Sequence, residues 1–162
     1  MTAIDKDTIL YASFAKAAGS RGCAFHNAGF KKHNINAIYK SFSINEINKL
    51  IDLMSKSKKP IFYTGGGVVN SGPEASNLLR ELVSMTGFPI TSTLQGLGCF
   101  PGDDNQFLGM LGMHGTYEAN NAMHDCDLMI NIGARFDDRI TGKIDEFSPK
   151  SKKVHIDIDP SS

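Results

Sequence analysis

The stretch PIFYTGGGVVNSG, residues 60–72, joins a short apolar run to three consecutive glycines. Residues 60–63 are nearly all apolar, which is typical of a strand covered on both faces of a parallel sheet. Residues 64–67 follow at the carboxyl end of that strand. Ser71, Gly72 and Pro73 then open a helix, with the proline in the first turn, where its missing N–H costs nothing. The stretch therefore predicts a strand, a tight glycine turn and a helix in direct succession.

The same alternation extends along the chain in both directions. Downstream, further strands are predicted near residues 88–93, 128–132 and 154–158, and helices at 73–86 and 116–125. Upstream, Ser43 and Glu46 have the spacing of a capping box at the start of a helix, and patterning predicts strands at 8–11 and 36–39 and a short helix at 24–32. Strand–helix–strand repetition with short connections predicts an α/β fold. We expect a Rossmann-like, doubly wound parallel sheet of about six strands with helices on both faces.

The length and composition predict one soluble globular domain. The 162 residues are 41% apolar and 21% charged, ordinary values for this class. Residues 1–57 are expected to form an N-terminal segment on the same sheet as residues 58–162. Seventeen basic residues balance seventeen acidic ones, so no overall charge favours nucleic acid or a membrane surface as partner.

The cysteines and the apolar runs indicate a cytoplasmic protein. Cys23, Cys99 and Cys126 form no C-x-x-C pair, so neither a disulfide framework nor a zinc site is indicated, and no other metal site is predicted. Free thiols are typical of a reducing compartment. No apolar run approaches the roughly 20 residues of a membrane span, and the N-terminus lacks the layout of a signal peptide.

Two glycine-containing loops follow predicted strands, where open α/β sheets bind ligands. In the first, Gly66 and Gly67 would bring backbone N–H groups close to a phosphate or a ring edge. Its spacing is not G-x-G-x-x-G, and the alternative is a purely structural turn. The second begins at Thr93 and Leu94 and continues to residues 109–115. There Met113 and His114 would contact a flat ligand, or the methionine fills a core gap and the histidine caps the next helix.

Charged residues follow the last two predicted strands. Gly133, Ala134 and Arg135 form a turn in which the arginine could bind a diphosphate bidentately, with Asp137 or Asp138 holding its neighbours. The alternative is a surface salt-bridge network that also includes Arg139. At the end of the final strand, Asp157 or Asp159 occupies the place where an acidic residue often binds ribose hydroxyls.

Four strings carry a resemblance to a known family: PIFYTGGGVVNSG (60–72), PITSTLQGLGCFPGDD (89–104), LGMLGMHGTYEANNAMHDCDLMINIGARFDDRITG (108–142) and HIDIDPSS (155–162). In order and spacing they resemble the central domain of the acetolactate synthase (acetohydroxyacid synthase) large subunit. The resemblance covers about 105 of the 162 residues. These enzymes use thiamine diphosphate and Mg²⁺, held by their other domains, to condense two pyruvates, or pyruvate with 2-oxobutyrate, in branched-chain amino-acid synthesis.

The resemblance implies an FAD site on the central domain, with a flavin that takes no net redox part. It places the contacts on Gly66, Gly67, Thr93, Leu94, Met113, His114, Gly133, Ala134, Arg135 and, at the ribose, Asp157. It also places Asp138 and Arg139 near the substrate channel. The sequence has no Gly-Asp-Gly followed about thirty residues later by Asn, the metal and diphosphate pattern of thiamine enzymes. We therefore expect no catalytic residue here and no condensation by this chain alone.

Residues 1–57 fit that family poorly. The run GCAFHNAGFKKHNINAIYKSF, residues 22–42, resembles instead the substrate domain of shikimate dehydrogenase, although Ser20-Arg21-Gly22-Cys23 breaks that family's serine pair. Two other functions stay open beside a flavin-binding domain: a non-catalytic α/β module for oligomerisation or regulation, and a small dehydrogenase, for which the nicotinamide fingerprint is missing. Apolar surface left uncovered by other domains also predicts a homo-oligomer.

Overall fold

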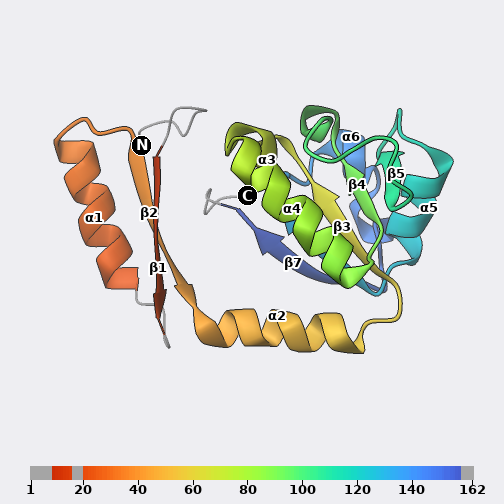
Figure 1. The fold of residues 1–162 in the computed structure, drawn as a ribbon, viewed down its shortest axis with the longest axis horizontal. Helices are drawn as coiled ribbons and strands as arrows, with labels where there is room; N and C mark the ends of the chain where they lie inside the picture. The colour runs from red at the N-terminus through yellow and green to blue at the C-terminus, as the bar shows by residue number, and fades with distance from the viewer. Residues whose placement is uncertain (1–8, 16–19, 158–162) are drawn as a thin grey trace. The chain divides into compact units, whose positions relative to one another are not determined.

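The computed structural model describes residues 9–15 and 20–157, and these fall into two compact units (Figure 1). One unit comprises the described residues up to Ser55, and the other runs from Lys56 to Asp157. The prediction of a single domain over residues 1–162 stays a prediction.

The first unit is built on two parallel strands joined by a helix. Strand β1 (Ile9–Ala15) pairs with β2 (Ala37–Ser43) over seven residues, and α1 (Ser20–Lys32) connects them. Helix α2 (Ile44–Lys56) begins directly after Ser43, as the capping-box spacing predicted. Its apolar stripe stays partly open to solvent, since Ile51 is 57% exposed.

The main sheet lies in the second unit and has five parallel strands in the order β5-β4-β3-β6-β7 (Figure 1). The bounds are β3 (Pro60–Thr64), β4 (Ile90–Ser92), β5 (Phe107–Met110), β6 (Leu128–Ile132) and β7 (Lys152–Ile156). The chain starts in the centre, adds two strands on one side, and returns to the other side. This is the predicted doubly wound topology.

The predicted parallel α/β sheet is confirmed, and in the described residues the main sheet has five strands where about six were expected. Strands β1 and β2 satisfy their backbone groups on each other instead of extending the main sheet. The edge strand β7 carries exposed Lys152 and Lys153, and charged side chains discourage pairing at a sheet edge. Strand β5 was not predicted because Gly109 interrupts it with a φ of 88° and the pairing with β4 is irregular there.

Helices cover both faces of the sheet, and their ends follow local sequence signals. They are α3 (Gly66–Asn70), α4 (Pro73–Thr86), α5 (Tyr117–Asp125) and α6 (Asp138–Thr141), with single 3₁₀ turns at Leu94–Gly96 and Ile144–Glu146. Helix α4 starts at Pro73 and ends at Gly87, whose φ of 69° gives the left-handed cap that glycine favours. Thr116 caps α5, because its hydroxyl accepts a hydrogen bond from the Ala119 N–H.

The core is divided by the sheet. On one face, Ile61, Tyr63 and Met129 pack with Ala119 and Met123 of α5. Phe62, Ile90 and Ile130 alternate with those strand residues and face the opposite side, and α4 buries Leu79 and Val83. Among the described residues no helix combines the length and the apolar character that crossing a membrane requires.

Asp127, just before β6, binds the segment that leads into β3. Its carboxylate accepts hydrogen bonds from the Ser57 hydroxyl and from the backbone N–H groups of Lys58 (2.8 Å) and Lys59 (3.0 Å). The hydroxyl and the N–H groups stabilise the charged form and lower the pKa of Asp127 below its ordinary 3.8.

Replacing Asp127 with alanine should therefore lower the free energy of unfolding by about 1 kcal/mol at pH 7, the net value of partly solvated hydrogen bonds. A depressed pKa stabilises the fold above the unfolded-state value, and this contribution disappears as the pH falls through the folded-state pKa. Urea unfolding at pH 7 and below pH 3.8 should show the difference from wild type shrinking in acid. An equal difference at both pH values would contradict this role of the carboxylate.

Candidate functional site

The predicted site residues follow the carboxyl ends of the five main strands. Because all five strands are parallel, the loops after them share one edge of the sheet (Figure 1). These loops start after Thr64, Ser92, Met110, Ile132 and Ile156. The chain reverses its direction of strand addition between β3 and β6, so the loops after these two strands meet at the switch point of the sheet.

The loops after β3 and β6 are in direct backbone contact. The Gly65 N–H donates to the Ile132 carbonyl (3.2 Å), and the Gly67 N–H donates to the Gly133 carbonyl (2.9 Å). A Cβ on Gly65 would lie 2.5 Å from the Gly133 oxygen, and one on Gly67 would lie 2.7 Å from the Gly133 Cα. The structure thus favours the turn interpretation for Gly67, whose N–H is already bonded. Cofactor contacts at Gly66 and Gly67 stay predictions.

The loop after β4 also rests on the end of β3. The Thr93 hydroxyl accepts from the Gly96 N–H (3.1 Å), and the Thr93 N–H donates to the Thr64 carbonyl (2.9 Å). Gly96 is buried, and a Cβ there would lie 2.9 Å from the Thr64 oxygen. Leu94 is left facing solvent, with 64% of its surface exposed. Thr93 therefore has a local capping role, and Leu94 is available to a ligand.

The loop after β5 exposes both residues predicted from the sequence. Met113 is 60% exposed and His114 is also exposed, so the methionine does not fill a core gap. Thr116, and not His114, caps the following helix. The Met113 N–H donates to the Arg139 carbonyl (2.9 Å), which joins this loop to the one after β6. The structure therefore contradicts a core-filling role for Met113 and a helix-capping role for His114.

The loop after β6 is anchored on both sides of Arg135. Ala134 is buried, and Asn131 bonds it twice: its Oδ1 accepts from the Ala134 N–H (3.1 Å) and its Nδ2 donates to the Ala134 carbonyl (2.7 Å). The Tyr63 hydroxyl donates to the Arg135 carbonyl (2.9 Å). Burial, with a smaller effect of Asp137, raises the pKa of Tyr63, so its hydroxyl stays a donor. The Arg135 side chain itself is exposed.

The acidic residues of this loop serve mainly local structure. Asp137 starts α6 by accepting a hydrogen bond from the Arg139 N–H (2.9 Å). That bond, the Asp138 side chain and the two arginines lower the pKa of Asp137. Asp138 and Arg139 are both exposed. Arg139 Nε lies 4.0 Å from Asp138 Oδ1, which supports the salt-bridge interpretation for this pair. After β7, Asp157 Oδ2 lies 3.7 Å from His155 Nε2, while Asp159 lies outside the described residues.

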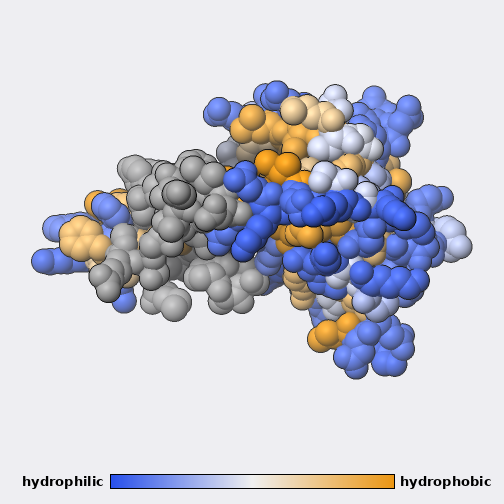
Figure 2. Space-filling view, turned by 90° about the horizontal axis from the view of Figure 1, so that it is seen from below, coloured by the Kyte–Doolittle hydropathy of each residue, from blue (hydrophilic) through white to orange (hydrophobic). Residues whose placement is uncertain are grey.

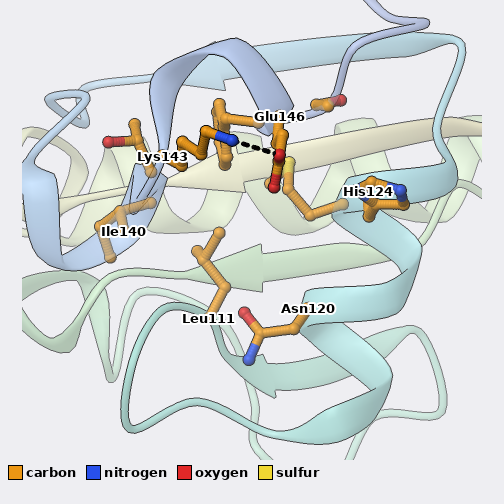
Figure 3. Close-up of a pocket in the computed structure, with 10 residues that line it drawn as sticks. Leu111, Asn120, His124, Ile140, Lys143 and Glu146 are labelled. Atoms are coloured by element: carbon orange, nitrogen blue, oxygen red, sulfur yellow. Dashed lines mark hydrogen bonds and ion pairs between the residues drawn. The ribbon is translucent and has the colours of Figure 1, made fainter.

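Two cavities were found outside the predicted cofactor residues. One, of about 260 Å³, lies between α5 and residues 140–148, and it is lined by Leu111 and by Lys143 and Glu146, which form an ion pair of 2.6 Å (Figure 3). The other, of about 610 Å³, lies at the amino ends of β3 and β4. Neither is lined by a predicted cofactor residue. Leu94, Met113, His114 and Arg135 are instead exposed, which fits an extended ligand lying across the sheet edge better than an enclosed one.

Sequence reasoning missed the side chains that hold this edge together. Tyr63, Asn131 and His155 lie within strands and were interpreted only as strand residues. A polar Asn131 inside the apolar run Leu128–Ile132 was the available signal, because a buried amide needs hydrogen-bond partners.

Comparison with known proteins places the chain in a family. The family "Thiamine pyrophosphate enzyme, central domain" matches residues 47–162. The acetolactate synthase large subunit of Haemophilus influenzae is 49% identical over 117 residues, covering 72% of this chain and 20% of that protein. Acetolactate synthase 1 of Zea mays is 50% identical over 115 residues, covering 71% of this chain and 17% of that protein. The chain spans about a fifth of the length of these curated relatives.

A solved structure shows the same fold. It is described as a thiamin diphosphate-dependent enzyme isolated from Mycobacterium smegmatis, with a TM-score of 0.57 at 20% identity, covering 78% of this chain and 25% of that one. Residues 1–46 precede the family match, and the resemblance near residues 20–50 to shikimate dehydrogenase stays a prediction. From residue 47 onward, the chain belongs to the thiamine pyrophosphate enzyme family and corresponds to the central domain of the acetolactate synthase large subunit.

Proposed function

We propose that this chain binds FAD along the carboxyl edge of its main sheet. The observation that carries the proposal is Arg135: it is exposed at the switch point of the sheet, while the residues on either side of it are anchored. A guanidinium offers two parallel N–H donors to a diphosphate. Leu94 and Met113 add exposed apolar surface for a flat ring.

The other predicted residues have supporting roles in this proposal. Asp157 would accept hydrogen bonds from the ribose hydroxyls, and His114 and Thr93 would contact the ring system. The backbone at Gly66, Gly67, Gly133 and Ala134 would lie against the ligand, with Asp138 and Arg139 beside the substrate channel. The bound flavin would supply a rigid planar body at the sheet edge.

The intact protein would be an acetolactate synthase of branched-chain amino-acid synthesis. In it, thiamine diphosphate and Mg²⁺ held outside this chain would support the condensation of 2-oxo acids. A reducing cytoplasm stays our proposed compartment, because Cys23, Cys99 and Cys126 are all free thiols. Self-association also stays a proposal, supported by the apolar residues that reach the surface on the face shown in Figure 2.

Titration with FAD, followed by flavin fluorescence, tests the proposal. Wild type should bind saturably, and Arg135→Ala should weaken binding at least tenfold, because a charge-assisted hydrogen bond contributes roughly 1.5–3 kcal/mol. Arg80→Ala is the matched control, since Arg80 is also exposed but lies on α4.

Two outcomes would contradict the proposal. Equal weakening by Arg80→Ala and Arg135→Ala would indicate nonspecific charge attraction instead of a site. No binding by wild type at high micromolar FAD would favour the second function considered, a non-catalytic module in oligomerisation or regulation, and would leave the family assignment unchanged.

A further inference from the structure

Side chains from three neighbouring strands converge on the backbone around Arg135. The Ala134 carbonyl accepts hydrogen bonds from Asn131 Nδ2 of β6 (2.7 Å) and bonds His155 Nε2 of β7 (3.0 Å). The Arg135 carbonyl accepts from the Tyr63 hydroxyl of β3 (2.9 Å). These strands are adjacent, in the order β3-β6-β7 (Figure 1). Side chains of three strands therefore fix the successive carbonyl groups of Ala134 and Arg135 at the carboxyl end of the sheet.

His155 has a defined role in this arrangement. A carbonyl oxygen can only accept, so His155 Nε2 must carry a hydrogen. The Asp157 carboxylate lies 3.7 Å from the same nitrogen. The imidazole also meets Phe136, with ring centroids 5.4 Å apart and the planes at 70°. His155 thus contacts the residues immediately before and after Arg135.

Two more aromatic rings contact Phe136. Its ring centroid lies 5.9 Å from that of Tyr63 and 6.0 Å from that of Phe147. Aromatic contacts at these distances stabilise a ring in one orientation. Ala134 is buried, with 3% of its surface exposed, and the Phe136 ring contacts three other rings, while the Arg135 side chain is exposed.

Fixing both neighbours restricts the backbone of Arg135 before any ligand arrives. Ordering a backbone on binding costs conformational entropy, and a segment that is ordered in advance avoids that cost. The guanidinium is thus presented from a rigid base, and only its own rotamers remain to be selected.

We propose that Tyr63, Asn131 and His155 are positioning residues that preorganise Arg135 for the diphosphate of a bound nucleotide. The inference rests on the proposed function and deepens it, because it assigns part of the affinity to residues that do not touch the ligand. His155 is the best residue to test, since its side chain is 20% exposed on an edge strand and contributes least to the core.

The experiment compares His155→Leu with His155→Gln. Leucine keeps the volume but cannot donate, so FAD binding, measured by flavin fluorescence, should weaken about tenfold. Glutamine supplies an amide N–H to the Ala134 carbonyl, so it should bind within about twofold of wild type. Tyr63→Phe, which removes the second anchor, should also weaken binding several-fold. Asp127→Ala is the control. Asp127 lies at the amino ends of β3 and β6, away from the carboxyl ends of the strands, so the variant should lower stability and leave FAD affinity unchanged.

Hydrogen exchange without ligand separates this inference from the proposed function. Amides of residues 135–137 should exchange faster in His155→Leu than in wild type or His155→Gln. Wild-type affinity together with unchanged exchange in His155→Leu would overturn the positioning role. If wild type binds no FAD, the proposed function fails and the positioning role for a nucleotide fails with it, and the exchange rates then report only whether His155 restrains residues 135–137.

Discussion

Replacing Tyr63 with alanine is expected to lower the free energy of unfolding by about 4 kcal/mol. Tyr63 is fully buried in the central strand β3 and packs in the cluster with Ile61, Met129 and Met123. Removing a large aromatic side chain from a core costs roughly 3–5 kcal/mol, because the cavity left behind closes only partly. Urea unfolding followed by far-ultraviolet circular dichroism gives the measurement.

Tyr63→Phe separates the ring from its hydroxyl. It should cost about 1 kcal/mol, because the Arg135 carbonyl loses its donor while the packing is kept. The folded-state pKa of Tyr63 is raised above its ordinary 10.0, so the unfolded chain loses this proton first as the pH rises. Wild-type stability should therefore fall above pH 10 by an amount that Tyr63→Phe lacks. Equal losses for the alanine and phenylalanine variants would contradict the cavity argument.

Replacing Gly65 with alanine should cost about 3 kcal/mol, the upper part of the range for overpacking a closed site. The added Cβ would lie 2.5 Å from the Gly133 oxygen and 2.6 Å from both the Cα and the Cβ of Ala134. Backbone atoms cannot rotate away as a flexible side chain can, so the loops after β3 and β6 must separate. The variant should also lose FAD affinity, because Arg135 follows directly in the displaced loop.

Gly102→Ala is the matched control for this substitution. Gly102 is exposed, and a Cβ built on it meets nothing within 4 Å. The control should therefore leave both the unfolding free energy and FAD binding close to wild type. A Gly65→Ala variant as stable as Gly102→Ala would show that the contact between the two loops is adjustable and does not constrain the site.

The sequence predicted those elements whose signals are local. Strand β6 matches its predicted bounds of 128–132, and Pro73 and Gly87 mark the two ends of α4 as expected. Strand β5 and helix α3 were missed because each is short and contains glycine, so tertiary contacts outweigh their weak propensities. The pairing partner of β1 and β2 could not be predicted, since apolar patterning does not identify which sheet a strand joins.

The candidate site was predictable to the level of loops. Glycines and charges after apolar runs marked the loops at the carboxyl ends of the parallel strands, which lie at one edge of the sheet, while the ligand contacts of these loops stay predictions. The convergence of Tyr63, Asn131 and His155 on one loop was not predictable. These residues are far apart in the sequence, and only the pairing of β3 with β6 and of β6 with β7 brings them together.

The doubly wound topology has a consequence for biosynthesis. Strand β3 forms the centre of the sheet and pairs with both β4 and β6, yet β6 begins at Leu128, 64 residues after β3 ends at Thr64. At a translation rate of roughly 5–20 residues per second, several seconds pass between the appearance of the two strands. During that interval one side of an apolar strand lacks its partner. The unpaired side of β3, at the centre of the sheet, is therefore exposed to misassociation in the nascent chain. The sheet is completed only after β6 and β7 have been synthesised.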